Sequence, residues 1–416
     1  MTLPVYGTKL IHHDSGAAYL VTVTAPTDMA ASFYEYSTNY NKAAHLITLS
    51  ILDTDKPSIA ELDTYFFSLA FLYRHSIELI LKAIAFQHLC SIADRAQFIK
   101  DTFHNLDEIL KYIERFSPSP RPNAEMDWLR SYLGDISKLD KESDSFRYPF
   151  HIISEKDQWS GGRRYSVARI FEKQTHIDLI KFANKFEAAY EILDNWYLKD
   201  SGNAVEWRDL APVFIEEGGY YYGQSVVGYG YNRDDFYPYT KAYLETANFL
   251  RDHMKSQKDA NTHVETELFL PMCYLYRNCA ELSLKAVWFQ QTKEDHQIRC
   301  KQMSKKKHSI LGMWNLIKPY AIRYSGGEGD LGFIADLEDY CSQLHAMDCD
   351  ASKFRYPVQK DMQPYFRNHQ TFDYENTGAF LEALNNAVDC IEMQLSVINE
   401  QIAEMEAEYR SYYSEY

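Results

Sequence analysis

A twelve-residue motif occurs twice in this chain, and the duplication restricts the folds that the chain can adopt. Residues 72–83 read LYRHSIELILKA, and residues 275–286 read LYRNCAELSLKA. A second motif, Phe-Arg-Tyr-Pro, stands at 146–149 and again at 354–357. Because both motifs keep their order, the chain is expected to contain two diverged copies of one structural unit.

The chain is long enough for each copy to form a domain. With 416 residues, of which 46% are hydrophobic, two domains of about 200 residues can each bury a core. We therefore expect a first helical domain over 1–203 and a second over 204–416, the latter with an extended C-terminal helix.

Hydrophobic periodicity predicts mainly α-helical units, each preceded by a short β-hairpin. The hairpins are expected over 8–23, around Asp14-Ser15-Gly16, and over 213–227, around Glu217-Gly218-Gly219. Helices follow in the same order in both copies, at about 40–52 and 239–254, 59–89 and 264–291, and then from His104 and from His308 onward. Each copy closes with an amphipathic helix, and the first copy carries an insertion around 160–165.

Each long central helix is expected to carry a charged stripe. Arg74, Glu78 and Lys82 are spaced four residues apart, so the Glu lies within reach of both cations. The second copy repeats the stripe as Arg277, Glu281 and Lys285. The surrounding residues are apolar, so the stripe must be paired. Two interpretations remain open: an ion-pair ladder that locks helices together, or a polar pocket in which the Arg binds an anionic ligand or an RNA phosphate.

The last helix of the second copy has a long apolar seam. Leu384, Val388, Ile391 and Leu395 alternate spacings of three and four, and the pattern continues through Ile398, Ile402, Met405 and Tyr409. This run extends beyond the equivalent helix of the first copy. We expect its end to project from the bundle and to form a homo-oligomer or meet a partner.

Charge and cysteine content limit the class of protein. The net charge of −16 argues against a surface that coats nucleic acid broadly, since such affinity comes from Lys and Arg meeting phosphates. The seven cysteines include no C-x-x-C pair, which suits a reducing cytosol, and neither a metal nor a cofactor is expected. No leader or membrane-spanning stretch is apparent, so a cytoplasmic protein with no membrane partner is expected.

The duplicated landmarks resemble the HEPN domain, a small helical bundle of prokaryotic toxins and defence proteins. They are a Glu-x-x-Leu-Lys-Ala helix, a later histidine (His104 and His308), and Arg-Tyr-Pro before the last helix. The resemblance covers both copies. It implies an all-α bundle that dimerises, with a cleft that the two copies can form within one chain, and we expect Arg147 and Arg355 each to lie near the stripe of its own copy.

Active members of that family cut RNA with an Arg-x(4–6)-His motif near the start of a late helix. Arg147 is followed by His151 after three residues, and Arg355 has no histidine nearby. Arg169 and His176 match the spacing and are expected at the start of the last helix of the first copy. By this resemblance the first copy would carry the catalytic residues, and the second would complete the cleft.

Three functions remain open from the sequence. The first is a metal-independent endoribonuclease of a toxin–antitoxin or antiviral defence system, with RNA as substrate. The second is a non-catalytic HEPN scaffold that binds a protein partner, such as a nucleotidyltransferase-like antitoxin or a defence sensor. The third is a small-molecule or nucleotide-sensing bundle in which the stripes and the Phe-Arg-Tyr-Pro arginines form the pocket.

Overall fold

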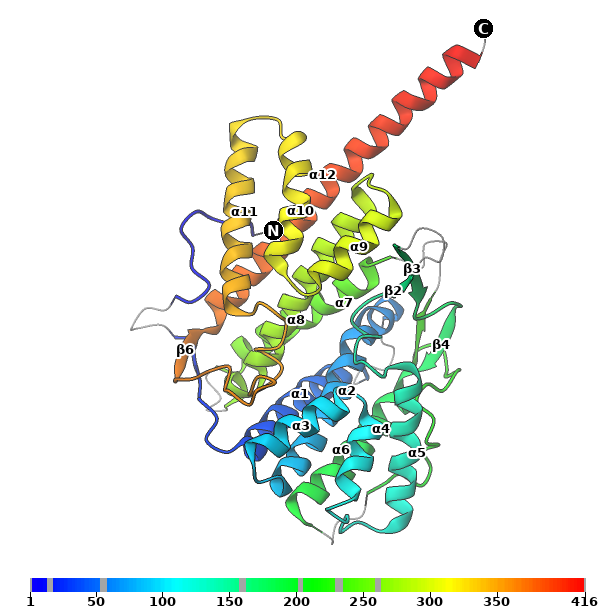
Figure 1. Ribbon diagram of the computed structural model, residues 1–416, viewed down its shortest axis with the longest axis vertical. Helices are drawn as coiled ribbons and strands as arrows, with labels where there is room; N and C mark the ends of the chain where they lie inside the picture. Colours follow the sequence, from blue (N-terminus) through cyan, green and yellow to red (C-terminus); the bar gives the residue numbers. More distant parts are fainter. Residues whose placement is uncertain are drawn as a thin grey trace.

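The fold is mainly α-helical and places the two copies in one body around a shared core (Figure 1). The computed structural model describes residues 2–12, 18–52, 58–156, 162–200, 205–228, 235–258 and 263–414. One continuous cluster of buried apolar residues includes side chains from both copies. The two copies therefore pack jointly around this core, and the predicted boundary between 203 and 204 lies outside the described residues.

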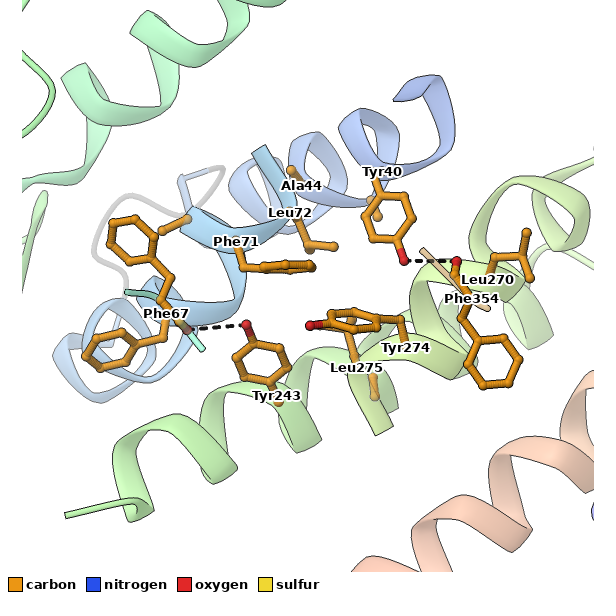
Figure 2. Packing of buried hydrophobic residues seen from close by; sticks show 14 of the residues in the cluster. Tyr40, Ala44, Phe67, Phe71, Leu72, Tyr243, Leu270, Tyr274, Leu275 and Phe354 are labelled. Atoms are coloured by element: carbon orange, nitrogen blue, oxygen red, sulfur yellow. Dashed lines mark hydrogen bonds between the residues drawn. The ribbon is translucent and has the colours of Figure 1, made fainter. Parts of the chain in front are cut away.

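Four helices form the centre of the molecule. They are α1 (Met29–Leu52), α2 (Ile59–His88), α7 (Tyr237–Ser256) and α8 (Val264–Ala286), which continues as a π-helix (Val287–Gln291). Helix α2 packs on α1 and α7, and α8 packs on α7 and α1. In Figure 2 the ring of Phe71 on α2 lies against that of Tyr274 on α8, with ring centroids 4.7 Å apart. The predicted central helices are confirmed, and their apolar surroundings follow from this position.

The remaining helices surround this centre in matching order. The first copy supplies α3 (Ile92–Thr102), α4 (Leu106–Glu114), α5 (Asn123–Leu139) and α6 (Leu179–Leu198). The second supplies α9 (His296–Lys306), α10 (Ile310–Arg323), α11 (Glu328–Met347) and α12 (Tyr374–Ser414). Side chains of Ser91, Asn105, Asp295 and Ser309 cap the N-termini of α3, α4, α9 and α10.

The short strands link the copies to each other. Strand β1 (Leu20–Val23) pairs with β6 (Gln370–Asp373), and β4 (Thr175–Asp178) pairs with β5 (Gln224–Val227), both antiparallel. The predicted opening hairpins are therefore wrong in the described residues, because the partner of each opening strand comes from the other copy. Alternating polarity indicates a half-buried strand but does not specify its partner. The Asp14-Ser15-Gly16 turn lies outside the described residues.

A hairpin distinguishes the first copy from the second. Strands β2 (Phe150–Lys156) and β3 (Arg163–Arg169) pair from Phe150 with Arg169 to Lys156 with Arg163. The predicted insertion at 160–165 belongs to this hairpin, although residues 160 and 161 lie outside the described ranges. The second copy has an isolated bridge between Val358 and Pro364 in the corresponding region.

Helix α12 extends beyond the bundle, as predicted (Figure 1). The last buried residue of this helix is Leu395, whereas Met405 and Tyr409 are 68% and 64% exposed. In the part of the chain that the structure describes, no helix is long and apolar enough to cross a membrane.

Candidate functional site

Glu78 is the centre of the first charged cluster. Its Oε1 accepts hydrogen bonds from Lys82 Nζ at 2.6 Å, His104 Nδ1 at 2.9 Å and Tyr356 Oη at 2.8 Å, and its Oε2 accepts from Arg74. Burial alone would favour the neutral acid, but the charge of Lys82 and the bond from His104 hold the pKa of Glu78 well below its usual value. The carboxylate is therefore ionised and fully used as an acceptor.

Glu281 repeats this arrangement in the second copy. It accepts from Lys285 at 2.7 Å, His308 Nδ1 at 3.1 Å, Tyr148 Oη at 2.6 Å, and Arg277. Burial opposes its ionisation, yet the neighbouring cations, Lys285 first, hold the pKa of Glu281 well below its usual value.

The first residue of each stripe, Arg74 or Arg277, has a structural role. Arg74 is wholly buried and lies 2.9 Å from Asp140 Oδ2, and it also donates to the carbonyl of His104. Arg277 lies 3.4 Å from Asp348 and donates to the carbonyl of His308. Arg74 thus ties α2 to the segment before α4 and to the segment after α5. Arg277 ties α8 in the same way to the segment before α10 and to the segment after α11. The ion-pair interpretation holds for these two residues.

The Phe-Arg-Tyr-Pro segments cross between the copies. Tyr356 of the second copy binds Glu78 and lies 3.2 Å from His104, and Tyr148 of the first copy binds Glu281 and lies 3.1 Å from His308. The expectation that each segment lies at the stripe of its own copy is wrong. The copies interlock, so the loop that follows α5 reaches the α8 cluster, and the loop that follows α11 reaches the α2 cluster.

Two tyrosines from α1 and α7 hold these segments in place. Tyr40 Oη donates to the carbonyl of Phe354 at 3.2 Å, a bond visible in Figure 2, and Tyr243 Oη donates to the carbonyl of Phe146 at 3.3 Å. Each bond again joins one copy to the other. The same geometry on both sides indicates a pseudo-twofold relation between the two clusters.

One cavity of about 430 Å³ lies between the two clusters. Both histidines and both Phe-Arg-Tyr-Pro arginines line it, together with Lys82, Lys307 and Lys360. Its carboxylates are Glu142, Asp144 and Asp350. Five cations line the cavity against three carboxylates, and four of the five remain when Lys82, which is paired with Glu78, is left out, in a protein whose net charge is −16. The cavity is a local basic site on an acidic molecule, which favours an anionic ligand.

Arg147 and Arg355 are buried but incompletely paired. They are 4% and 5% exposed, and the Nε atoms donate to the carbonyls of Ser143 at 2.6 Å and Ala351 at 2.8 Å. The Nη1 atom of each guanidinium has no hydrogen-bond acceptor among the described residues. Both residues line the cavity, and the charge of Arg147 acts on Arg355. A buried charged donor without an acceptor is costly, so an anion is the kind of ligand that this pair of arginines favours.

The two histidines are neutral. Burial lowers the pKa of His104 to about 4 despite the nearby Glu78. Glu281 favours protonation of His308, but burial and the charges of Lys285 and Arg147 outweigh it, so the pKa of His308 is also lowered. Because Nδ1 of each ring donates to an ionised glutamate, Nε2 carries the lone pair and can accept a proton.

The predicted catalytic residues are dispersed. Arg147 lines the cavity. His151 on β2 does not line it but lies beside a lining residue, with Nδ1 3.2 Å from Asp144 Oδ2, and this hydrogen bond raises the pKa of His151. Arg169 ends β3, and His176 lies in β4, where Nδ1 is 3.3 Å from Gln224. Neither lines the cavity. The prediction that this pair stands at the start of a helix is wrong, since its spacing spans a connection between strands.

Sequence reasoning missed the two tyrosines and Lys307. Tyr148 and Tyr356 were visible as members of a duplicated motif, but their partners in the other copy were not. Lys307 directly precedes His308, in the position that Phe103 takes before His104.

Comparisons with known proteins leave the chain without an assigned relative. Neither the family models, nor the curated proteins, nor the solved structures include a match.

Proposed function

We propose that the chain is a HEPN-type effector of a prokaryotic defence or toxin–antitoxin system, and that the cavity between its copies binds and cleaves RNA without a metal ion. One observation carries the proposal. Two buried arginines, one from each copy, line the same cavity, and the Nη1 atom of each has no hydrogen-bond acceptor among the described residues. A phosphodiester has the charge and the planar pairs of oxygens that such a clamp recognises.

In this proposal His308 is the general base and Lys82 the general acid, on either side of Arg147 and Arg355. In the proposed reaction, His308 Nε2 takes the proton of the ribose 2′-hydroxyl, and the 2′-oxygen attacks phosphorus. The bond from phosphorus to the 5′-oxygen breaks, and that oxygen takes a proton from Lys82. Burial lowers the pKa of Lys82, which makes its ammonium a better acid. The products are a 2′,3′-cyclic phosphate and a 5′-hydroxyl, and Arg147 and Arg355 stabilise the phosphorane-like transition state.

RNA cleavage by the full chain in the presence of EDTA tests this proposal. Loss of one donor to a transition-state oxyanion typically costs about 10²–10³-fold in rate. We expect such losses for Arg147→Ala and Arg355→Ala, and for His308→Ala, with 2′,3′-cyclic ends on the wild-type products. Arg169→Ala and His176→Ala serve as controls, because neither residue lines the cavity. Wild-type rates in the Arg147→Ala/Arg355→Ala double variant would refute the site.

A second function is favoured by a different observation. The exposed end of α12 carries Met405, Tyr409 and Tyr412, which suits a contact with another protein. The alternative is therefore a non-catalytic nucleotide-binding subunit that docks a nucleotidyltransferase-like antitoxin or a defence sensor. A protein that binds nucleotide in the cavity and never cleaves RNA, with or without such a partner, would support it.

A further inference from the structure

The two sides of the cavity differ although the backbone repeats. Phe103 and Lys307 end α3 and α9 with nearly equal torsion angles, φ 47° and ψ −107° for Phe103, and φ 51° and ψ −110° for Lys307. Each directly precedes a cluster histidine and lines the cavity. The same site in the fold therefore presents a benzyl ring on one side and an ammonium group on the other.

A second substitution explains why only one side is hollow. Phe150 and Val358 both follow their Phe-Arg-Tyr-Pro segments directly. Phe150 starts the β2–β3 hairpin and packs on Phe236 and Phe289, with ring centroids at 5.4 and 4.9 Å. That ring fills the recess beside the second cluster.

The smaller Val358 leaves the equivalent recess open beside the first cluster. There Phe33 of α1, Ile99 of α3 and Phe103 line the cavity together with Val358, Met362 and Tyr365. Phe103 is 51% exposed, although phenylalanine side chains are usually buried. Apolar and aromatic groups thus gather at one end of a cavity whose other residues are mainly charged.

We propose that this recess, on the His104 side of the cavity, is a nucleobase subsite. A nucleotide would place its 5′-phosphate between Arg147 and Arg355 and its base against Phe103 and Tyr365. In the reaction proposed above this is the leaving nucleotide, whose 5′-oxygen faces Lys82. Stacking on an aromatic side chain strengthens the binding of a base and tolerates every base.

The ammonium of Lys307 gives the site a direction. It lies beside His308, on the side where the attacking 2′-hydroxyl would sit, and it is exposed at the mouth of the cavity. A phosphate one nucleotide further along the strand can bind there. The ligand class is therefore single-stranded RNA, held in one orientation despite the pseudo-twofold relation of the copies.

Calorimetry with the full chain tests the subsite by comparing adenosine 5′-monophosphate with ribose 5-phosphate. Both carry the phosphate, and only the first carries a base. We expect the nucleotide to bind about tenfold more tightly, which corresponds to about 1.4 kcal/mol. Val358→Phe, which fills the recess as Phe150 does, should remove this preference and leave ribose 5-phosphate binding unchanged. Ile92→Ala, an exposed change at the start of α3, is the control.

Phe103→Ala keeps the test decisive if Val358→Phe does not fold, because the Phe103 ring is largely exposed. It should reduce the preference several-fold. An equal preference in wild type, Val358→Phe and Phe103→Ala would overturn the subsite, even if RNA is cleaved. A nucleotide preference that depends on Phe103, without RNA cleavage, would support the subsite and overturn the proposed reaction. If neither adenosine 5′-monophosphate nor ribose 5-phosphate binds, both the subsite and the proposed reaction are overturned.

Discussion

At the scale of single residues, the two buried glutamates determine how the site is held. Glu78 and Glu281 each accept from an arginine, a lysine, a histidine and a tyrosine, and both are fully buried. A buried carboxylate with four donors fixes the tautomer of its histidine and keeps two cations neutralised. The same group therefore serves both stability and the protonation state of the cavity.

Replacement of Glu78 by Gln should lower the free energy of unfolding by about 2–4 kcal/mol, because Lys82 and Arg74 lose their common anion. Glu281→Gln should behave alike, and Glu406→Gln on the exposed end of α12 is the matched control. Denaturant titration at pH 7 measures the difference. The pKa of Glu78 is depressed, so its contribution is present above its unfolded pKa and fades as the pH falls through the folded value. Unfolding curves for Glu78→Gln that match wild type would show that the charge of Glu78 contributes little to the free energy of unfolding.

The pH profile of RNA cleavage should reflect the shifted pKa values of base and acid. The pKa of His308 is lowered, so the base stays neutral and the rate should persist below pH 6.5, where an ordinary histidine is half protonated. The pKa of Lys82 is lowered too, so the alkaline decline should begin below pH 10.5. Initial rates from pH 4 to 10 test both limbs. An acid limb centred at or above pH 6.5 would contradict the assignment of His308.

At the scale of elements, strands and helices contribute differently to the assembly. The strand pairs β1–β6 and β4–β5 and the tyrosine bonds from α1 and α7 all join one copy to the other. The β2–β3 hairpin lies against α9, where Tyr165 exchanges two backbone hydrogen bonds with the side chain of Gln297 at 2.7 and 2.6 Å. Phe150, the first residue of this hairpin, occupies the position that Val358 takes in the second copy and packs on Phe236 and Phe289.

The end of α12 should mediate self-association or partner binding without supporting the fold. Asn399 still bonds to the carbonyl of Gln291 at 2.8 Å, whereas residues from 403 onward are exposed as far as their side chains are described. Deletion of 403–416 should therefore leave the melting temperature within about 2 °C and lower the oligomeric mass, since exposed apolar seam residues are poorly tolerated in water. Light scattering checks the mass. Equal masses for the shortened and intact chains would assign no assembly role to this end.

At the scale of the whole molecule, the two copies form one interdependent unit. Each cluster lacks one of its donors without the other copy, because Tyr356 completes the first and Tyr148 the second. The cavity and its pair of arginines exist only where the copies meet. A duplicated sequence has thus produced an internal pseudo-dimer rather than two independent domains.

Fragments 1–203 and 204–416 should therefore co-purify when expressed together with a tag on one of them. Expressed alone, the first fragment would expose the face of α2 that packs on α7 and would lack the β6 partner of β1. It should be recovered as a homodimer or as aggregate, because an apolar face of that size needs a cover. A soluble monomeric first fragment that melts as high as the full chain would show that the copies fold independently.

Local patterns in the sequence were enough to identify the duplication, the central helices and the charged residues of the two clusters. Helical periodicity placed α2 to within one residue, and it placed α8 together with the π-helix that continues it to Gln291. The paired motifs drew attention to Glu78, Glu281, Arg147 and Arg355. These are local signals, since a helix and its stripe depend on residues a few positions apart.

Which copy completes which cluster depends on the packing of the folded chain. The crossing of Tyr148 and Tyr356, the strand exchange, and the removal of Arg169 and His176 from the cavity depend on partners more than 100 positions apart or on strand pairing. A period-two pattern or an Arg-to-His spacing carries no information about such partners. The asymmetry of the cavity also depends on tertiary packing. Phe150 and Val358 stand at equivalent positions and differ in size, and this difference changes the shape of the cavity only where the copies pack together.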